Sequence, residues 1–529
     1  MRKLPIGIQD FEKLRTEDFV YVDKTEYVYR LAETGIPCFL SRPRRFGKSL
    51  FLSTLRAYFE GKRELFKGLR IEELEGDDED AFVEYPVFYF DLVSGSYMEK
   101  GDLEEVLDRH LCDWEEIYGR DDRKKTLAGR FQHLLKAAKE KTGRNCVVLV
   151  DEYDKPLLDT MADKDLNEYN RAVFKGFFST LKSYDGYLRF VFITGVTRFS
   201  KVSIFSDLNQ LRDISMINDY AGICGITESE IHDCFMPEIM DMAKKKGMTE
   251  KECLNGLKRM YDGYHFSQEG EDVYNPYSLL NALLDKRLGS YWFSTGTPTF
   301  LIEKLRATGF DAKDFTEKEV WAGEEKISDY RADDTDLIPL FYQTGYLTIK
   351  KAQEKKGGHI RYLLGYPNDE VKYGFLNSLA PVYLHETGSD VGLDIFAIDD
   401  ILSEGDTDAL KDVFTALFAR LPYYEGKEDI DKWAERDFQN VIYIVFMLLG
   451  EIVKVQQHSS NGRADCIVET GDYVYIFEFK RDKSAREAMQ QIEDKGYDKP
   501  YTADKRRVIK IGASFCSSDR ALDGWIVSK

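Results

Sequence analysis

The stretch IPCFLSRPRRFGKSLFLSTLRAYFEG, residues 36–61, gives the clearest indication of how this chain folds. Its apolar start predicts a short buried strand. From Lys48 onward, apolar residues recur at helical spacing until Gly61, which predicts a helix with a stop signal. The loop between them ends in Gly47, Lys48 and Ser49, the last three residues of the phosphate-binding pattern G-x-x-x-x-G-K-[ST]. The stretch therefore predicts a strand–loop–helix unit that binds phosphate.

The first half of this loop departs from the pattern. Arg42 holds the position of the first glycine. Glycine at that position permits a tight turn, and arginine does not easily take positive φ. The loop is therefore expected to enter the site differently, stiffened by Pro43. Arg42, Arg44 and Arg45 bring three permanent cations to the mouth of the site, and arginine is well suited to phosphate oxygens.

Three further apolar segments predict strands that alternate with helices. They are PVFYFDL (residues 86–92), NCVVLVDEYD (145–154) and LRFVFITGVTRF (188–199). This alternation is typical of a parallel α/β sheet. The second segment ends in Asp151 and Glu152, the Walker B form. In that form the aspartate holds the metal and the glutamate polarises the attacking water.

These motifs predict a site for ATP and Mg²⁺. In it Gly47 lets the backbone approach a phosphate, Lys48 reaches the β- and γ-phosphates, and the hydroxyl of Ser49 is offered to Mg²⁺. Thr194 ends a strand where it can sense the γ-phosphate. Arg198 is placed to reach the phosphates of its own chain or those of a neighbour in a homo-oligomer. Each motif also has a simpler interpretation. Gly47-Lys48-Ser49 is then a chance triplet, and the pair Asp151 and Glu152 is a solvated acidic turn at a strand end. Thr194 then has no ligand, and Arg198 forms a surface ion pair.

Several segments together resemble a known family. They occur in the order YVDKTEYVYRLAETGIPCFLSRPRRFGKSLFLSTL, VDEYDKPL, FITGVTRFSKVSIFSDLNQL, YDGYHF, YNPYSLL and YQTGYLTI. The chain resembles the bacterial AAA-ATPase-like family, which carries a C-terminal nuclease-like domain, from about residue 4 to residue 500. The family's own loop reads Arg-Pro-Arg-Arg-Phe-Gly-Lys-Ser, so the missing glycine is a family trait. The resemblance implies an ATP-binding P-loop domain followed by helical and winged-helix-like parts.

A second group of polar residues lies in GRADCIVETGDYVYIFEFK, residues 462–480. Glu478 and Lys480 are two residues apart on a predicted strand, so their side chains share a face. Asp465 joins them if the two strands pair as a hairpin. Two carboxylates beside a lysine predict a Mg²⁺ or Mn²⁺ site. Such a metal activates water and steadies the departing oxygen of a phosphodiester.

This arrangement resembles the PD-(D/E)XK nuclease pattern, written here as Asp465…Glu478-Phe479-Lys480. The following predicted helix, capped by Ser484 and Glu487, adds Gln491, as in nucleases with an extra glutamine motif. Glu435, on the predicted preceding helix, is a further metal ligand in this interpretation. The alternative is a solvated hairpin with an ion pair across one face, and nuclease folds are also retained as binding modules.

Length and pattern predict four parts. At about 100–200 residues per domain, 529 residues correspond to three or four domains. The predicted division is an AAA-like ATPase domain at 1–225, a helical region at 226–290, a winged-helix-like and helical connector at 291–430, and a nuclease-like domain at 431–529. The predicted fold class is α/β, with a P-loop NTPase parallel sheet and a C-terminal PD-(D/E)XK nuclease-like α/β domain.

Composition bounds the partners. The net charge is −20, which discourages a simple nucleic-acid-coating role. Residues 1–70 carry a net charge of +6 and residues 431–529 a net charge of zero, so the middle carries about −26. This distribution leaves DNA open as a substrate and makes the acidic middle a candidate surface for a protein partner. The chain has no apolar run of about 18 residues and no secretory h-region, and its eight cysteines are scattered, so no membrane and a cytoplasmic location are expected.

The leading hypothesis is an ATPase fused to a Mg²⁺-dependent endo- or exodeoxyribonuclease that acts under nucleotide control. A second hypothesis is a nucleotide-gated signalling or scaffold protein whose nuclease-like domain only binds nucleic acid or protein. A third is an ATPase whose true partner is a protein docked on the acidic middle.

Overall fold

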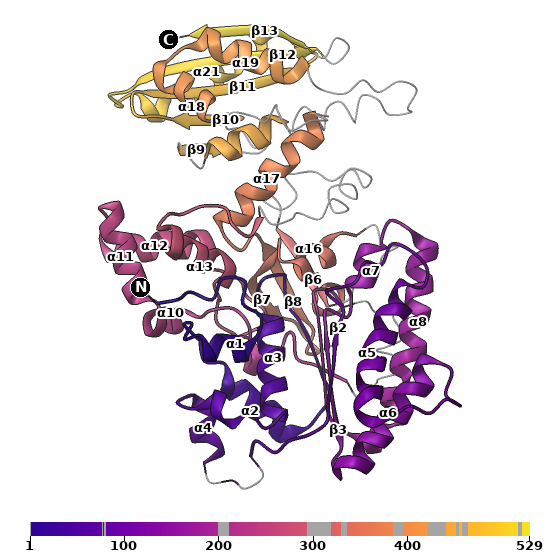
Figure 1. Ribbon diagram of the computed structural model, residues 1–529. Coiled ribbons are helices and arrows are strands. Elements are labelled where there is room, and N and C mark those ends of the chain that lie inside the picture. The colour runs from indigo at the N-terminus through magenta and orange to yellow at the C-terminus, as the bar shows by residue number, and fades with distance from the viewer. Residues whose placement is uncertain are drawn as a thin grey trace. The chain divides into compact units, whose positions relative to one another are not determined.

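The computed structural model describes residues 2–76, 78, 81–198, 211–293, 319–328, 336–384, 395–419, 441–450, 454–457, 464–516 and 521–528. The chain forms two compact units, which are described separately (Figure 1). Unit 1 consists of Met1–Thr295 and Trp321–Glu370, and unit 2 of Gly296–Val320 and Val371–Lys529. The predicted boundary at residue 225 falls inside unit 1, and the four-part division stays a prediction.

Unit 1 is built on a five-stranded parallel sheet in the order β2-β3-β4-β1-β5. Its strands are β1 (Cys38–Ser41), β2 (Val87–Asp91), β3 (Cys146–Asp151), β4 (Leu188–Gly195) and β5 (Arg212–Asp213). The four predicted strands are confirmed as β1 to β4. Every residue of β3 is buried, as expected for a parallel strand covered on both faces. The two-residue strand β5 was not predicted because it is too short to show a pattern.

Helices cover both faces of this sheet, as Figure 1 shows. On one side lie α1 (Phe11–Thr16), α2 (Thr25–Thr34), α3 (Lys48–Phe59) and α4 (Arg70–Glu75). On the other lie α5 (Asp102–Tyr118), α6 (Leu127–Thr142) and α8 (Lys164–Ser183), with the short helix α7 (Lys155–Asp159) after β3. The predicted helix from Lys48 is confirmed as α3. Because the strands are parallel, the carboxyl ends of β1, β3 and β4 meet at one edge of the sheet, where ligands bind in open α/β folds.

The chain then forms the predicted helical region. Its helices are α10 (Glu228–Cys234), α11 (Met236–Lys246), α12 (Glu250–Tyr261) and α13 (Pro276–Asp285). They pack around an apolar cluster. Threonine followed three residues later by glutamate, as at Thr227 and Glu230, predicts a capping box, and the structure has it at the start of α10. Between α12 and α13 the chain turns back on itself through an antiparallel bridge from Tyr264 to Val273, which the sequence pattern did not indicate.

The last part of unit 1 is a three-stranded sheet in the order β6-β8-β7. The strands are β6 (Val320–Gly323), β7 (Thr348–Glu354) and β8 (Ile360–Gly365), with the helices α15 (Glu324–Ile327) and α16 (Ile338–Thr344) between β6 and β7. Helix α17 (Asp369–Leu384) follows. Its first two residues belong to unit 1 and the remainder to unit 2, so one helix carries the chain from one unit into the other.

Unit 2 contains a mixed sheet in the order β13-β12-β11-β10-β9. The strands are β9 (Lys454–Gln457), β10 (Cys466–Glu469), β11 (Tyr473–Arg481), β12 (Arg507–Cys516) and β13 (Ala521–Ser528). Only β11 and β12 pair in parallel, joined through α21 (Ala485–Lys495) with its predicted capping box. The helices α18 (Ile395–Glu404) and α19 (Thr407–Ala419) complete the unit. The pattern of residues 431–450 predicts a helix, and residues 441–449 are helical. The apolar segment RRVIKIGASF, residues 506–515, predicts a strand and forms β12. The strand β13 follows it, and its half-exposed, mixed sequence gave no strand signal.

In the parts of the chain that the structure describes, no helix combines the length and apolar character needed to cross a membrane.

Gly263 offers a test of the packing behind the phosphate loop. Its φ is 89°, and a Cβ at this position would lie 2.4 Å from the carbonyl oxygen of Pro367. We expect Gly263→Ala to lower the free energy of unfolding by about 2 kcal/mol or more, since both the backbone conformation and the space exclude a side chain. Chemical denaturation measures this change. Gly186→Ala is the control, because no atom lies within 4 Å of the added methyl group; an equal loss in both variants would contradict the packing described.

Candidate functional site

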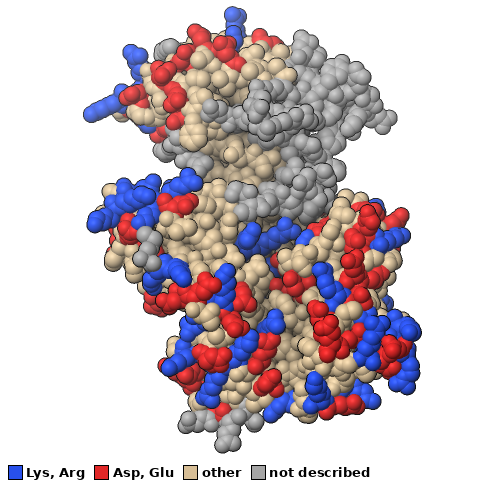
Figure 2. Space-filling view, viewed as in Figure 1, with Lys and Arg blue, Asp and Glu red and all other residues tan. Residues whose placement is uncertain are grey.

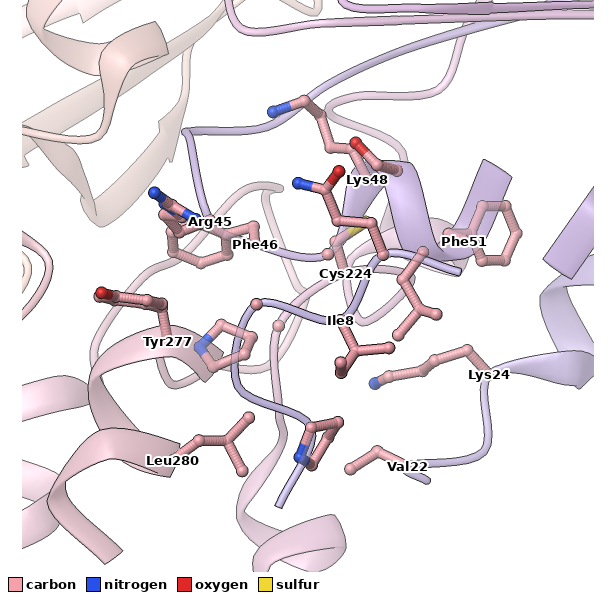
Figure 3. Close-up of a pocket in the computed structure, with 18 of the residues that line it drawn as sticks. Ile8, Val22, Lys24, Arg45, Phe46, Lys48, Phe51, Cys224, Tyr277 and Leu280 are labelled. Carbon is pink, nitrogen blue, oxygen red and sulfur yellow. The ribbon is translucent and has the colours of Figure 1, made fainter. Parts of the chain in front are cut away.

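Unit 1 contains a cavity of about 450 Å³ beside the phosphate loop (Figure 3). One end is lined by the loop from Arg44 to Ser49, with Glu152 and Lys155. The other end is apolar and is lined by residues from three segments, among them Ile8, Val22 and Leu280. Its volume lies in the range of roughly 300–1,000 Å³ typical of sites for small molecules.

The loop holds its lysine in a closed arrangement. The buried Nζ of Lys48 donates to the carbonyl oxygens of Arg42 at 3.0 Å and Pro43 at 3.2 Å. Gly47 has a φ of 95° and precedes α3, whose first residue is Lys48. Free N–H groups at the start of that helix face an anion favourably. Ser49 lies in the second position of α3 and lines the cavity.

The backbone explains why no glycine is needed at position 42. The left-handed residues of the loop are Arg45, with φ of 68°, and Gly47. The guanidinium of Arg45 lies over the ring of Tyr277 at 4.9 Å from its centroid. Both residues line the cavity. The expected different entry of the loop is therefore confirmed, and the strained conformation is located three residues later than the pattern G-x-x-x-x-G-K-[ST] indicates.

Arg42 is turned away from the cavity, which corrects the expectation of three cations at its mouth. Its guanidinium is buried and donates to the carbonyl oxygens of Ser215 at 2.7 Å and Tyr220 at 3.1 Å. It also stacks on Phe266 at 4.2 Å. Burial lowers the pKa of this guanidinium. Arg42 therefore anchors the loop, while Arg44 and Arg45 remain exposed beside the cavity.

The carboxylates at the end of β3 are joined to β4 by one hydroxyl. Thr194 Oγ1 donates to Asp151 Oδ1 at 2.7 Å and accepts from the backbone N–H of Glu152 at 3.3 Å. The hydroxyl of Tyr89 lies 3.4 Å from Asp151 Oδ2. This contact arises because β4 lies between β1 and β3. Thr194 and Asp151 thus lie together and are buried, and the neighbouring Glu152 lines the cavity.

Glu152 is held in an uncommon environment. Its φ is 47°, in the left-handed region. Burial raises the pKa of its carboxyl, and the ammonium of Lys48 opposes this effect. Asp154, which sequence reasoning missed, is fully buried and accepts from the backbone N–H groups of Val196 at 3.0 Å and Thr197 at 2.6 Å. Asp154 thus fixes the turn that carries Glu152. Its presence in the segment VDEYDKPL was the one indication in the sequence that it matters.

Arg198 lies outside the cavity. Its guanidinium pairs with Asp213 at 3.0 Å, and its backbone N–H donates to Gln343 Oε1 at 2.9 Å. It is not among the residues that line the cavity, so in this arrangement the ion-pair interpretation fits its position. A cation that does line the cavity and was not predicted is Lys155, which pairs with Asp159.

The apolar end of the cavity was also missed. Its lining includes Pro5 to Gln9, Phe235 and Leu280, besides the residues named above. Lys24 closes this end, with its Nζ bonded to the carbonyl oxygen of Gly222 at 2.7 Å and to Glu230 at 2.6 Å. Apolar side chains carry no chemical signature in a sequence, so only their convergence in space identifies them.

In unit 2 the predicted nuclease residues lie together. The register of β10 and β11 pairs Cys466 with Phe477, which sets Asp465 opposite Glu478. Asp465 Oδ2 accepts from the backbone N–H of Phe479 at 2.8 Å. Lys480 Nζ donates to Glu478 Oε1 at 2.8 Å.

The helix that follows β11 completes this group. The same ammonium of Lys480 donates to Gln491 Oε1 at 2.7 Å, and Gln491 Nε2 lies 3.4 Å from the hydroxyl of Tyr497. Alternation along β11 places Glu478 and Lys480 on the face covered by α21, while Phe477 packs on the opposite face against Phe446. Period-two patterning thus separates the polar group from the aromatic core.

The polar group fits a hard divalent cation. Glu478 Oε2 is buried and has no hydrogen-bond partner in the described structure. Burial, and next the charge of Asp465, raise the pKa of Glu478. Two adjacent carboxylates that disfavour joint ionisation accept a cation readily. The described residues hold no cluster of three or more metal-ligating side chains, and Glu435, the predicted further ligand, lies outside them.

Comparisons with known proteins agree with both sites. A family model described as "Predicted AAA-ATPase" matches residues 5–205, and one described as "PD-(D/E)XK nuclease superfamily" matches residues 434–525. The chain is also 37% identical over 531 residues to an "Uncharacterized protein in vnfD 5'region" of Azotobacter chroococcum mcd 1, with 99% of each chain covered. The chain therefore belongs to the family of predicted bacterial AAA-ATPases that carry a C-terminal PD-(D/E)XK nuclease superfamily domain.

Proposed function

We propose that unit 1 binds and hydrolyses ATP with Mg²⁺, and that unit 2 cleaves DNA with a divalent metal under the control of the bound nucleotide. The observation that carries the first half is the cavity itself. The phosphate loop, with Lys48 and the start of α3, lines one end of this cavity, and apolar side chains line the other end. A nucleotide needs both ends, since its phosphates are anionic and its base is largely apolar.

The residues of the cavity have distinct roles in this proposal. Lys48 leaves the loop carbonyls and pairs with the β- and γ-phosphates, aided by the N–H groups at the start of α3. Arg44 adds a cation at the open end. Ser49 and Asp151 would hold Mg²⁺, which neutralises phosphate charge. Glu152 orients the attacking water, and burial raises the pKa of its carboxyl, which makes the carboxylate a stronger base toward that water.

In unit 2, Asp465 and Glu478 would hold the divalent metal, which supplies an activated water for phosphodiester cleavage. The ammonium of Lys480 stabilises the charge that develops on the phosphate. Gln491 orients that ammonium, because Gln491 Oε1 accepts a hydrogen bond from Lys480 Nζ at 2.7 Å.

The eight cysteines are all free thiols, which fits a reducing compartment such as the cytoplasm. The proposal includes a homo-oligomer in which a neighbouring chain supplies a further cation at the phosphates. The acidic middle as a protein-docking surface gains no support from the visible face of unit 1, where acidic and basic side chains are interspersed (Figure 2).

Lys48→Ala tests the nucleotide site. We expect ATP hydrolysis to fall by about 10²-fold or more, because the charge that meets the phosphates is removed. Phosphate release and calorimetric titration with ATP measure hydrolysis and binding. Lys136→Ala, which removes an exposed lysine of α6, is the matched control. Undiminished hydrolysis by the Lys48 variant would refute the assignment of this loop.

Asp465→Ala and Lys480→Ala test the nuclease site. We expect each to reduce metal-dependent cleavage of linear, circular or single-stranded DNA by about 10²-fold or more. Lys505→Ala is the control, since that lysine is exposed. Cleavage should also fall as pH decreases through the raised pKa of Glu478, because protonation removes a ligand of the metal. The absence of cleavage by the intact protein with any divalent ion would contradict the proposal.

A binding role for unit 2 is the second candidate. It is favoured by the ammonium of Lys480, which is already engaged by both Glu478 and Gln491. Removal of divalent ions with a chelator separates the two functions. A nuclease loses activity without metal, whereas a binding module retains its affinity for DNA and shows no cleavage before or after the treatment.

A further inference from the structure

Trp292 connects the phosphate loop to a distant part of unit 1. Its indole Nε1–H donates to the carbonyl oxygen of Arg44 at 3.1 Å, and Arg44 lines the cavity. The side chain is buried, and its ring lies 5.5 Å from that of Tyr346. The contact therefore joins residue 44 to a segment almost 250 positions later in the chain.

Glu370 holds the backbone of Trp292 in place. Its Oε1 accepts from the backbone N–H groups of Trp292 at 2.7 Å and Tyr291 at 2.5 Å. The hydroxyl oxygen of Ser278, in α13, accepts from the same backbone N–H of Trp292 at 3.2 Å. Glu370 is itself the second residue of α17 and is buried. Burial raises the pKa of the Glu370 carboxyl to about 7. Its two backbone hydrogen bonds fix residues 291 and 292 to the first turn of α17.

We propose that Trp292, held by Glu370, is a positioning residue of the phosphate loop and couples the conformation of that loop to the first turn of helix α17. The proposal rests on nucleotide binding for its biological meaning, because it is the nucleotide that changes the loop. The loop contact itself exists without nucleotide, so the two ideas can fail separately.

The physical basis is a competition for the carbonyl groups of the loop. Lys48 Nζ is bonded to the carbonyl oxygens of Arg42 and Pro43, and the next carbonyl, that of Arg44, is bonded to Trp292. Phosphates attract Lys48 away from the first two carbonyls, so the loop relaxes between its anchors. The Trp292 contact moves with residue 44, and Glu370 transmits the change to α17.

The same linkage acts in reverse. Phosphate binding shifts the conformational equilibrium of the first turn of α17 by some factor. A partner that favours the same conformation of that turn raises the affinity of the loop for phosphates by the same factor, since coupling between two sites is reciprocal. Most of α17 belongs to unit 2. In the proposed function, α17 is the segment of the chain through which nucleotide control passes.

The test uses the full-length protein and two readouts. Trp292→Phe keeps an aromatic ring but removes the N–H donor and part of the buried ring volume. Trp321→Phe makes the same chemical change on β6, where Trp321 contacts Arg361, and is the control. We expect ATP to bind about three- to tenfold more weakly to Trp292→Phe, as for the loss of one hydrogen bond. The change in tryptophan fluorescence on ATP addition should be lost in that variant and retained in Trp321→Phe.

Hydrogen exchange of the amides of residues 291, 292 and α17 gives the second readout. We expect ATP to alter their protection in the wild type and not in Trp292→Phe. Glu370→Gln, which retains an acceptor oxygen without the charge, should give an intermediate change and guards against misfolding of the first variant. Normal ATP binding with unchanged protection of α17 in the wild type would overturn the coupling.

A ligand-free comparison keeps the outcome decisive if ATP does not bind. Lys48→Ala frees the carbonyls of Arg42 and Pro43 and so alters the loop directly. We expect this substitution to change the protection of residues 291, 292 and α17, and the double substitution Lys48→Ala with Trp292→Phe to leave α17 as in Trp292→Phe alone. Equal protection of α17 in the wild type and Lys48→Ala would overturn the proposal, whereas failure of ATP binding alone would overturn only the proposed function.

Discussion

The buried guanidinium of Arg42 is the contact on which the arrangement of unit 1 depends. A buried cation is costly unless its donors are satisfied. Here backbone carbonyl groups of residues 215 and 220 accept from the two terminal nitrogens and Phe266 supplies a π face, while the buried Nε has no hydrogen-bond partner in the described structure. The segments that follow the parallel sheet must therefore lie against the entrance of the phosphate loop. In exchange, the loop needs no glycine at its first position, because its entry is fixed from outside.

The four loop residues that follow Arg42 each have a partner from a later segment of unit 1. A Cβ on Gly345 would lie 2.8 Å from Pro43, so only glycine allows this approach. The remaining contacts pair Arg44 with Trp292, Arg45 with Tyr277, and Phe46 with Tyr264 and Phe266. These partners explain the segments YDGYHF, YNPYSLL and YQTGYLTI, which carry little catalytic chemistry of their own. Their side chains hold the loop, and Tyr277 and Leu280 also line the cavity.

Unit 2 follows a simpler rule. Strand β11 has an aromatic face and a polar face because its side chains alternate, and pairing with β10 brings Asp465 opposite Glu478. The parallel crossover through α21 then carries Gln491 over the polar face. A short run of sequence thus generates a complete polar group without distant contacts, which is why its residues were identifiable before the structure was known.

The sequence by itself determined the strands β1 to β4 and β10 to β12, the helix after the phosphate loop, the capping boxes of α10 and α21, and the polar group of unit 2. These features depend on local periodicity and on residues a few positions apart. Tertiary structure alone decided that Arg42 and Arg198 lie away from the cavity, since burial and ion pairing with distant segments determine where a long cationic side chain points. It also decided the apolar end of the cavity, the role of Asp154 and the contact from Trp292 to the loop. Those depend on residues that are far apart in the chain and chemically ordinary, and only the packing of unit 1 brings them together.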